Sequence, residues 1–241
     1  MRAVKRILFG AIVCTLIFGF SARGESYTLE KGEELTYKAQ FLNIIPVGTV
    51  TITVGEMTKY EGAKVFPITC RGRSAQWIAL LFKAETQLTA TVDSTKIYPY
   101  RYEQVLRIAG KPDDLRLATY DRAHNIMEAQ GKGRKKVPVD VRDPLSAIFF
   151  LRTQPLKDQF QVKQMINSNQ SNYIFDAKVI GKKVINRVVC WVVDAKVRRE
   201  NKSMYHSMDV TVYVSADERQ VPVLIKAKTK IGPVALVLVA R

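Results

Sequence analysis

Apolar and polar residues alternate one by one along most of this chain. In residues 35–41 and 50–54 every second side chain is apolar, and the residues between them are mostly threonine, lysine or glutamine. A period of two, rich in Val, Ile, Thr and Tyr, is typical of half-buried antiparallel strands. The same pattern predicts further strands at 66–70, 84–92, 99–109, 114–121, 125–130, 159–166, 172–180, 184–198, 205–214, 221–230 and 234–239.

Short polar or glycine-containing segments separate these strands. Pro46-Val47-Gly48, Gly110-Lys111-Pro112, Ile180-Gly181 and residues 215–218 have the composition of turns. About a dozen strands with short connections predict one large curved antiparallel sheet, a half-barrel or barrel-like structure, with a β-sandwich as the alternative. No change in composition marks an internal boundary, so we expect residues 25–241 to form a single β-rich domain.

Two segments interrupt the alternation and predict short helices. Asp143 at the cap position and Pro144 at the first helical position favour a helix start. Residues 145–151 are apolar on nearly every side, which predicts a buried helix that plugs the open end of the curved sheet. Residues 74–82 also contain large apolar side chains. They fit either core packing or an apolar flap over a ligand cavity.

The N-terminus has the order of a secretory signal peptide. Basic residues at 2, 5 and 6 precede an apolar run at 7–20, and small residues at Ala22 and Gly24 follow. The run is shorter than the roughly 20 residues that a spanning helix needs. We therefore expect residues 1–24 to be cleaved after Gly24 and residues 25–241 to reside in the periplasm, soluble or peripheral to a membrane. An uncleaved N-terminal anchor is the alternative.

Cys70 and Cys190 remain after this cleavage. An oxidising compartment allows them to form a disulfide. Both lie in apolar, strand-like runs, where a free cysteine is equally at home as a small buried side chain. The sequence leaves these two alternatives open, because it does not show whether the two strands are neighbours.

The formal net charge of the whole chain is +16, which favours anionic partners. Lys132, Arg134, Lys135 and Lys136 form a basic loop between two predicted strands. Export argues against nucleic acid as the partner. The remaining polyanions of an envelope are lipid head groups, the phosphates of lipopolysaccharide and acidic glycans, and basic residues near anionic lipid gain about 1 kcal/mol each. The alternative is that such side chains only keep a sheet edge soluble and unpaired.

The search for catalytic or metal-binding patterns gives none. The two histidines, His124 and His206, stand in unrelated contexts, and no Gly-x-Ser-x-Gly elbow is present. There is no paired-histidine or Cys-x-x-Cys spacing and no calcium-binding loop. We therefore expect a protein that is not an enzyme and that has no cofactor and no metal.

Several stretches taken in order resemble a known bacterial envelope family, domain of unknown function 3108. They are residues 32–37 and 45–50, the segment Asp143-Pro144-Leu145-Ser146-Ala147 with residues 150–152, and residues 214–223 and 230–234. The resemblance covers nearly all of residues 25–241. It implies a periplasmic or outer-membrane-facing protein built from a curved antiparallel sheet. It implies neither an activity nor any functional residue.

Together these observations predict an exported protein that holds a lipid or another hydrophobic or anionic envelope ligand on the concave face of its sheet. Small-molecule sites are typically concave and apolar. The predicted ligand-binding residues are Trp77, Leu81, Phe82, Phe149 and Phe150, and the predicted anion-binding residues are Lys132, Arg134, Lys135 and Lys136. The alternative is a non-catalytic assembly module that docks on another envelope protein or on cell-wall glycan.

Overall fold

In the computed structural model, residues 27–79, 83–168, 171–202, 207–229 and 232–241 are described, and they contain fifteen strands and two helices. The first group comprises β1 (Glu34–Phe41), β2 (Ile45–Val54), β3 (Thr58–Tyr60), β4 (Ala63–Ser74), α1 (Gln76–Ala79), β5 (Ala84–Asp93), β6 (Pro99–Ile108), β7 (Asp114–Asp121), β8 (Ile126–Ala129) and β9 (Gly133–Lys136). The second comprises α2 (Pro144–Arg152), β10 (Gln161–Ser168), β11 (Ser171–Ile185), β12 (Val188–Arg199), β13 (Met208–Ser215), β14 (Pro222–Thr229) and β15 (Gly232–Ala240). The predicted signal peptide lies outside the described residues.

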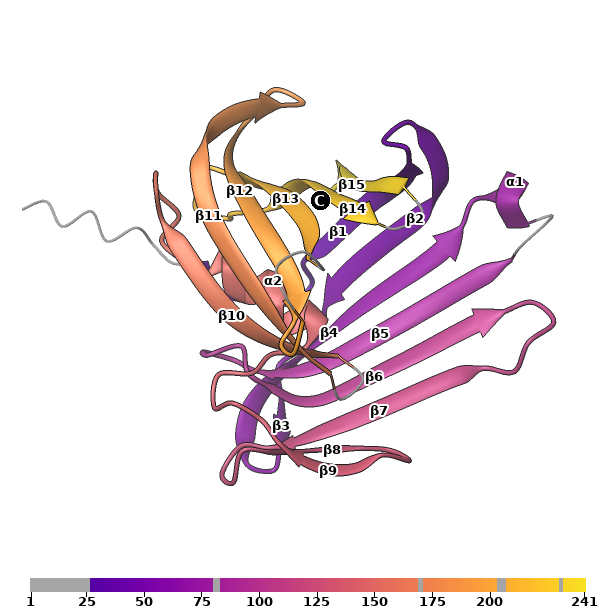
Figure 1. Cartoon of the computed structure of the whole chain (residues 1–241), viewed down its shortest axis with the longest axis vertical. Helices are drawn as coiled ribbons and strands as arrows, with labels where there is room; N and C mark the ends of the chain where they lie inside the picture. Colours follow the sequence, from indigo (N-terminus) through magenta and orange to yellow (C-terminus); the bar gives the residue numbers. More distant parts are fainter. Residues whose placement is uncertain (1–26, 80–82, 169–170, 203–206, 230–231) are drawn as a thin grey trace, which may run out of the picture.

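All fifteen described strands belong to one antiparallel sheet, which confirms the predicted architecture. The spatial order is β10-β11-β12-β13-β14-β15-β1-β2-β4-β5-β6-β7-β8-β9, with β3 paired to β4 beside this path. The first and last strands of the chain are therefore neighbours in the middle of the sheet, where Tyr37 lies opposite Leu238. The sheet curls so that β10–β13 face β4–β7 across its concave side (Figure 1).

Helix α2 fills the space between the two curled halves. It packs against β4 and β5 on one side and against the edge strand β10 on the other (Figure 1). Just before the helix, Arg142 forms a parallel bridge with Ile166 of β10. The helix thus joins two parts of the sheet that share no backbone hydrogen bonds, as expected for a plug at one end of a curved sheet.

The start of α2 follows the sequence prediction. The Asp143 carboxylate accepts hydrogen bonds from the backbone amides of Leu145 at 2.7 Å and Ser146 at 3.1 Å, and the Asp143 amide donates to Ser146 Oγ at 2.9 Å. Pro144 occupies the first helical position, where its missing N–H costs nothing. Leu145 and Phe149 of this helix belong to the larger core cluster, and Leu151 belongs to a second cluster on β11–β13.

The predicted turn at Pro46-Val47-Gly48 is wrong. Strand β2 runs through these residues, and the chain reverses at Leu42 and Asn43, whose φ angles are +51° and +62°. An asparagine tolerates this left-handed conformation better than most residues. The signal of the turn was therefore Asn43 rather than the proline and glycine that follow it.

The predicted break at Ile180-Gly181 is a bulge rather than a turn. Strand β11 continues through it, with a register shift between Val179 and Lys182 that Gly181 accommodates at a φ of +138°. The hairpin turns at Asn186 and Arg187, which both have positive φ. Two successive positive φ angles are characteristic of a two-residue hairpin turn that matches the strand twist.

The segment 132–136 is not the loop that the sequence predicted. Residues Gly133–Lys136 form β9, a fully exposed strand at one edge of the sheet. Its basic side chains are of the kind that discourage another chain from pairing with an open edge. The three-residue strand β3 was also not predicted, because it is too short to show alternation.

Candidate functional site

An apolar hollow of about 350 Å³ lies on the concave face near the end of the sheet that carries α1. It is formed by the ends of β1, β2 and β4 and by the adjoining parts of β5 and β6. The side chains that line it include Ala39, Val50, Gly72, Ile78, Ala84 and Leu106. The end of β4 that contributes Gly72 and Ser74 to this lining is next to α1 and away from α2 (Figure 1).

Small side chains create this hollow. Ala39 lies opposite Gly48 on the neighbouring strand, and Gly72 lies between Val50 and Thr86. Deeper in the sheet the row of inward positions carries larger residues, namely Leu35, Ile52, Cys70 and Leu88. Large side chains therefore cover the inner face in the core, and small side chains leave space on it toward the end near α1.

Position 48 itself accepts no residue larger than glycine. A Cβ atom added at Gly48 would lie 2.3 Å from the carbonyl oxygen of Arg73 on β4. The contact is with backbone, which cannot move aside as a flexible side chain could. The close approach of β2 and β4 at the floor of the hollow therefore depends on glycine.

Helix α1 stands beside the hollow and is tied to it. The indole Nε1 of Trp77 donates a hydrogen bond to the carbonyl oxygen of Pro46 at 2.9 Å, and Ile78 lines the hollow. Trp77 itself is 52% exposed. The predicted residues Leu81 and Phe82 lie outside the described residues. Of the predicted apolar flap, Trp77 thus positions the segment and Ile78 faces the hollow.

A second, polar hollow of about 280 Å³ lies on the concave face of β6 and β7. It is bounded by the end of β8 and the turn that follows it. Its polar and charged lining residues are Tyr102, Gln104, Asp114, Arg116, Gln130 and Lys132, and its apolar ones are Leu115, Leu117, Ala118 and Ala129. The Arg116 guanidinium donates from Nη2 to Asp114 Oδ2 at 2.5 Å and from Nε to Asp114 Oδ1 at 3.2 Å.

The two hollows adjoin on β6. Leu106 lines the apolar hollow and Gln104 lines the polar one. They point to the same face because they are two residues apart on one strand, which separates them by about 7 Å. The lining of the concave face therefore changes from apolar to polar and charged between Leu106 and Gln104, two residues apart on β6.

Phe149 and Phe150 do not line either hollow. Phe149 is 1% exposed and packs in the core, with its ring centroid 6.4 Å from that of Tyr27. Phe150 lies under the Arg142 guanidinium, 3.8 Å from ring centroid to Cζ. Helix α2 is far from α1 in the fold (Figure 1). The five predicted ligand-binding residues therefore do not form one site, because the two phenylalanines pack around the plug.

Arg142 contributes to the structure around the start of α2 and lines neither hollow. Its Nη1 donates to the carbonyl oxygens of Lys96 and Ile97 at 2.9 and 2.8 Å, and its guanidinium also stacks on Tyr98. Burial lowers its pKa to about 10. It fixes the turn at Lys96–Tyr98, where Ile97 has a φ of +56°, to the start of α2.

Arg152, at the other end of α2, forms a buried ion pair. Its Nη1 and Nη2 donate to Glu33 Oε2 and Oε1 at 2.8 and 2.7 Å, and both side chains are almost fully buried. The Tyr27 hydroxyl donates to Glu33 at 2.6 Å, and Gln220 Nε2 donates to the carbonyl oxygen of Arg152 at 2.6 Å. This network holds the segment before β1, the end of α2 and the β13–β14 turn together. No local sequence pattern marks this network, because its members are far apart in the chain.

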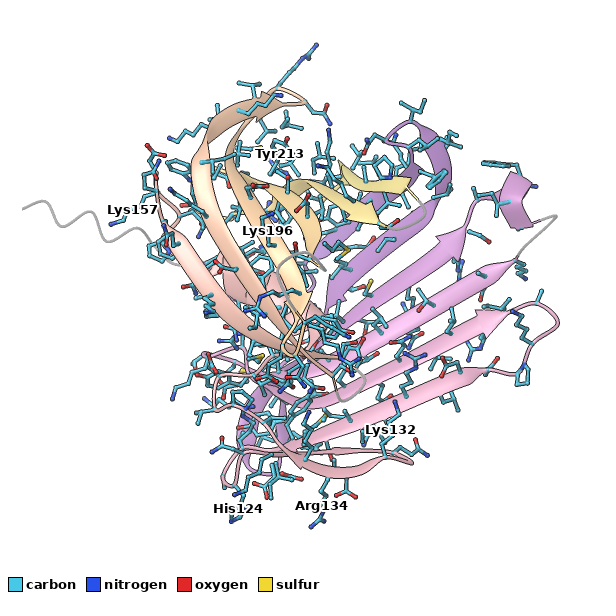
Figure 2. The ribbon with its side chains drawn as sticks, viewed as in Figure 1. His124, Lys132, Arg134, Lys157, Lys196 and Tyr213 are labelled. Atoms are coloured by element: carbon cyan, nitrogen blue, oxygen red, sulfur yellow. The ribbon has the colours of Figure 1, made fainter. Side chains whose placement is uncertain are left out.

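The predicted basic residues are divided between two places. Lys132 lines the polar hollow, while Arg134, Lys135 and Lys136 lie on the exposed edge strand β9. Arg134 Nε donates to Glu128 Oε2 at 2.8 Å. Figure 2 shows Lys132 on the side toward β7 and Arg134 at the outer margin of the molecule.

Cys70 and Cys190 are both buried and both free, so the candidate disulfide is not formed. Cys70 lies on β4 and Cys190 on β12, and five strands of the sheet separate these two. Cys70 belongs to the larger core cluster, whereas Cys190 lies on β12 opposite Ser215 of β13. Burial raises the pKa of the Cys70 thiol to about 11.

The described residues contain no group of three or more His, Cys, Asp or Glu side chains that could hold a metal ion. His124 lies in the exposed β7–β8 turn, with Nδ1 2.7 Å from Asp121 Oδ2, and His206 is outside the described residues. Within the part of the chain that the structure covers, no helix has the length and apolar character required to span a membrane.

Two solved structures are similar over most of this chain. The barrel-like protein of domain of unknown function DUF1849 from Brucella abortus aligns with a TM-score of 0.59 and 7% sequence identity, covering 88% of this chain and 97% of that one. This similarity establishes the barrel-like fold and nothing about activity. A protein with a YmcC-like fold from Bacteroides fragilis covers 88% of this chain and 96% of its own, at 10% identity and a TM-score of 0.35, a value too low to support an argument.

No curated protein sequence matches the chain. The family model described as protein of unknown function (DUF3108) matches residues 34–239, from the first strand to the last. This range contains both hollows, both helices and all fifteen described strands except the last residue of β15. The chain therefore belongs to the DUF3108 family, as its ordered motifs predicted.

Proposed function

We propose that this protein is an exported, non-catalytic binding protein of the bacterial envelope that holds a hydrophobic ligand in the apolar hollow. The N-terminal sequence supports export. The observation that carries the proposal is the hollow itself, where alanine and glycine replace the larger residues of the deeper core. A sheet that needed only stability would gain from filling this volume with side chains.

The size and lining of the hollow agree with this function. Its volume of about 350 Å³ lies within the roughly 300–1,000 Å³ typical of small-molecule sites. The face is apolar over Ala39, Val50 and Ile78, so a hydrocarbon chain would leave water without losing hydrogen bonds. Such burial contributes about 0.8 kcal/mol for each CH₂ group.

The first test is native mass spectrometry of the protein purified from its own envelope, followed by organic extraction. We expect a discrete bound lipid or other hydrophobic molecule. The second test replaces a small lining residue by a large one, Ala39→Phe or Ala84→Phe. Both positions face the hollow rather than the packed core, so the new ring should occupy the ligand volume and abolish copurification.

Ala123→Phe is the matched control, because Ala123 is exposed in the β7–β8 turn. It introduces the same ring without entering the hollow, and it should retain the ligand. Thermal unfolding of all three variants verifies that they fold. If folded Ala39→Phe and Ala84→Phe retain as much ligand as the Ala123→Phe control, the apolar hollow is not the binding site.

A further inference from the structure

We propose that the ligand is an amphiphile with an anionic head group, and that its two parts occupy the two adjoining hollows. The hydrocarbon would lie in the apolar hollow and the head group beside Gln104, Arg116 and Lys132. This inference rests on the proposed function and deepens it by naming the chemical class of the ligand. It also assigns a binding role to Gln104 and Arg116.

The charge of the polar hollow favours an anion. Of the residues that line it, the charged ones are Asp114, Arg116 and Lys132. One carboxylate therefore stands with two cations, which leaves a formal charge of +1. Asp114 occupies the Nε and Nη2 groups of Arg116, and the guanidinium has further N–H donors beyond these two.

Neutral donors complete the arrangement. Gln104, Gln130 and Tyr102 also line this hollow, and their side chains carry amide and hydroxyl donors. Carboxylate and phosphate oxygens accept hydrogen bonds from such groups and from guanidinium and ammonium groups, and the charged bonds are roughly twice as strong as neutral ones. The residue types thus match an acidic oxygen-rich head group.

The distance between the two hollows limits the length of the connection between the head group and the tail of the ligand. The border between the hollows runs between Gln104 and Leu106, about 7 Å apart on one strand. A carboxylate joined directly to an acyl chain, or a phosphodiester joined through glycerol, spans this distance. A zwitterionic choline head group brings a cation to Lys132 and Arg116 and is disfavoured there.

The experiment compares ligands that share one tail. Lysophosphatidylglycerol, lysophosphatidylcholine and free myristate, all with the same myristoyl chain, are titrated into the full purified protein below their critical micelle concentrations. Inorganic phosphate is the fourth probe. We expect each anionic amphiphile to bind at least about tenfold more tightly than the choline lipid, and phosphate alone to bind far more weakly than either.

The informative variant is the double substitution Arg116→Gln with Lys132→Gln. It changes the formal charge of the hollow from +1 to −1, because Asp114 remains. The expected result is loss or reversal of the preference for the anionic lipid, with binding of the choline lipid retained. Lys163→Gln with Lys178→Gln removes two exposed charges on β10 and β11 and should leave the preference unchanged.

The outcomes separate this inference from the proposed function. If lysophosphatidylglycerol is the anionic probe that binds tightly, the proposal is supported and the ligand is a phosphodiester lipid. If myristate binds tightly, the proposal is supported and the ligand is a fatty acid. Equal affinity of the wild-type protein for all three amphiphiles overturns the head-group site but leaves a hydrophobic carrier. If inorganic phosphate binds as tightly as the lipids, the tail contributes nothing to binding, and the proposal that the ligand is an amphiphile is wrong. Failure of every amphiphile to bind overturns both proposals.

Discussion

Glu33 and Arg152 carry opposite charges in a place where neither reaches water. Burial acts to raise the pKa of Glu33, but the hydrogen bonds and charge of Arg152, with the Tyr27 hydrogen bond, outweigh it and hold this pKa below its ordinary value. The charged pair is therefore the stable form inside the fold. It joins three segments at 27–33, 152 and 219–220 that are otherwise held by separate elements.

Glu33→Gln is expected to destabilise the protein by about 3–5 kcal/mol, because Arg152 becomes a buried charge without a counterion. The free energy of unfolding from urea denaturation measures this. The combination Glu33→Leu with Arg152→Met should lose less than either single substitution, since no charge then remains buried. Glu34→Gln is the control, because the adjacent Glu34 is exposed. If Glu33→Gln unfolds at the wild-type urea midpoint, the pair contributes nothing.

The stability that the Glu33–Arg152 pair contributes depends on pH, because Glu33 must be ionised. A carboxyl group whose folded pKa is depressed contributes stability above its unfolded pKa, ordinarily near 4.5, and loses it as the pH falls through the folded value. The wild-type protein should therefore lose more stability than Glu33→Gln between neutral pH and acid. Urea midpoints measured over this range give the comparison.

Asp143 is predicted to behave in the opposite way. Burial raises its pKa in spite of the hydrogen bonds from Ser146 and Leu145, and its Oδ2 has no partner within the described part of the chain. Folding therefore favours the protonated form, and stability falls as the pH rises through the window between the unfolded and folded pKa values. Asp143→Asn keeps the cap acceptor and removes the charge.

We expect Asp143→Asn to be at least as stable as the wild type at pH 7 and to show a flatter dependence of the urea midpoint on pH above about 4. Asp143→Ala serves as the reference for loss of the cap, which costs about 1 kcal/mol. A loss in Asp143→Asn as large as that in Asp143→Ala contradicts the interpretation, because it would mean that the ionised carboxylate stabilises the fold.

At the level of elements, α1 and α2 have different functions although both are short and apolar. Phe149 in α2 is 1% exposed and Trp77 in α1 is 52% exposed. Phe149→Ala should cost about 3–5 kcal/mol through the cavity that it leaves. Trp77→Ala should cost little stability, but it should weaken ligand retention because α1 loses its hydrogen bond to Pro46.

Thermal unfolding and native mass spectrometry of the two variants provide the comparison. Equal losses of stability would show that Trp77 is part of the core. Retention of the ligand by Trp77→Ala at the wild-type level would show that α1 does not contribute to the site.

The elements that the sequence predicted are those with a local signal. Alternation marks β5, β6 and β7 to within about two residues, and Asp143-Pro144 marks the start of α2. The misses also have local causes. β9 has the composition Gly-Arg-Lys-Lys, which contains no apolar position, and Gly181 absorbs a bulge in a place that resembles a turn. Short polar edge strands depend on their neighbours rather than on their own residues.

At the scale of the whole molecule, Cys70 and Cys190 are free in a fold that buries both, which predicts that both thiols stay reduced. A reducing agent should leave the melting temperature of the purified protein unchanged. Cys70 and Cys190 should react with a maleimide in urea and be protected in the native state, because both are buried and the pKa of Cys70 is raised. A drop in melting temperature with the reductant, together with an absence of reactive thiols in urea, would demonstrate a disulfide.

The candidate site was beyond the reach of sequence reasoning for a related reason. Ala39, Gly72 and Ala84 lie on three different strands, and only the register brings their small side chains to one place. The predicted ligand-binding residues included the large aromatic residues Phe149 and Phe150, but these pack around α2. The hollow is instead formed where the side chains are small. Of the predicted basic cluster, only Lys132 lines one of the two hollows, because it lies in the β8–β9 turn while Arg134, Lys135 and Lys136 lie on the exposed strand β9.

The pairing of β1 with β15 also sets the order in which the molecule can form. Strands β4 to β9 and strands β10 to β15 are two series in which each strand pairs with the next along the chain, so each series can assemble through contacts between neighbouring segments. β1 obtains its second partner only when residues 232–240 are available. Pairing between such distant residues is slow. The complete sheet therefore forms only once residues 232–240 are available, and the chain exposes the edge of β1 until then.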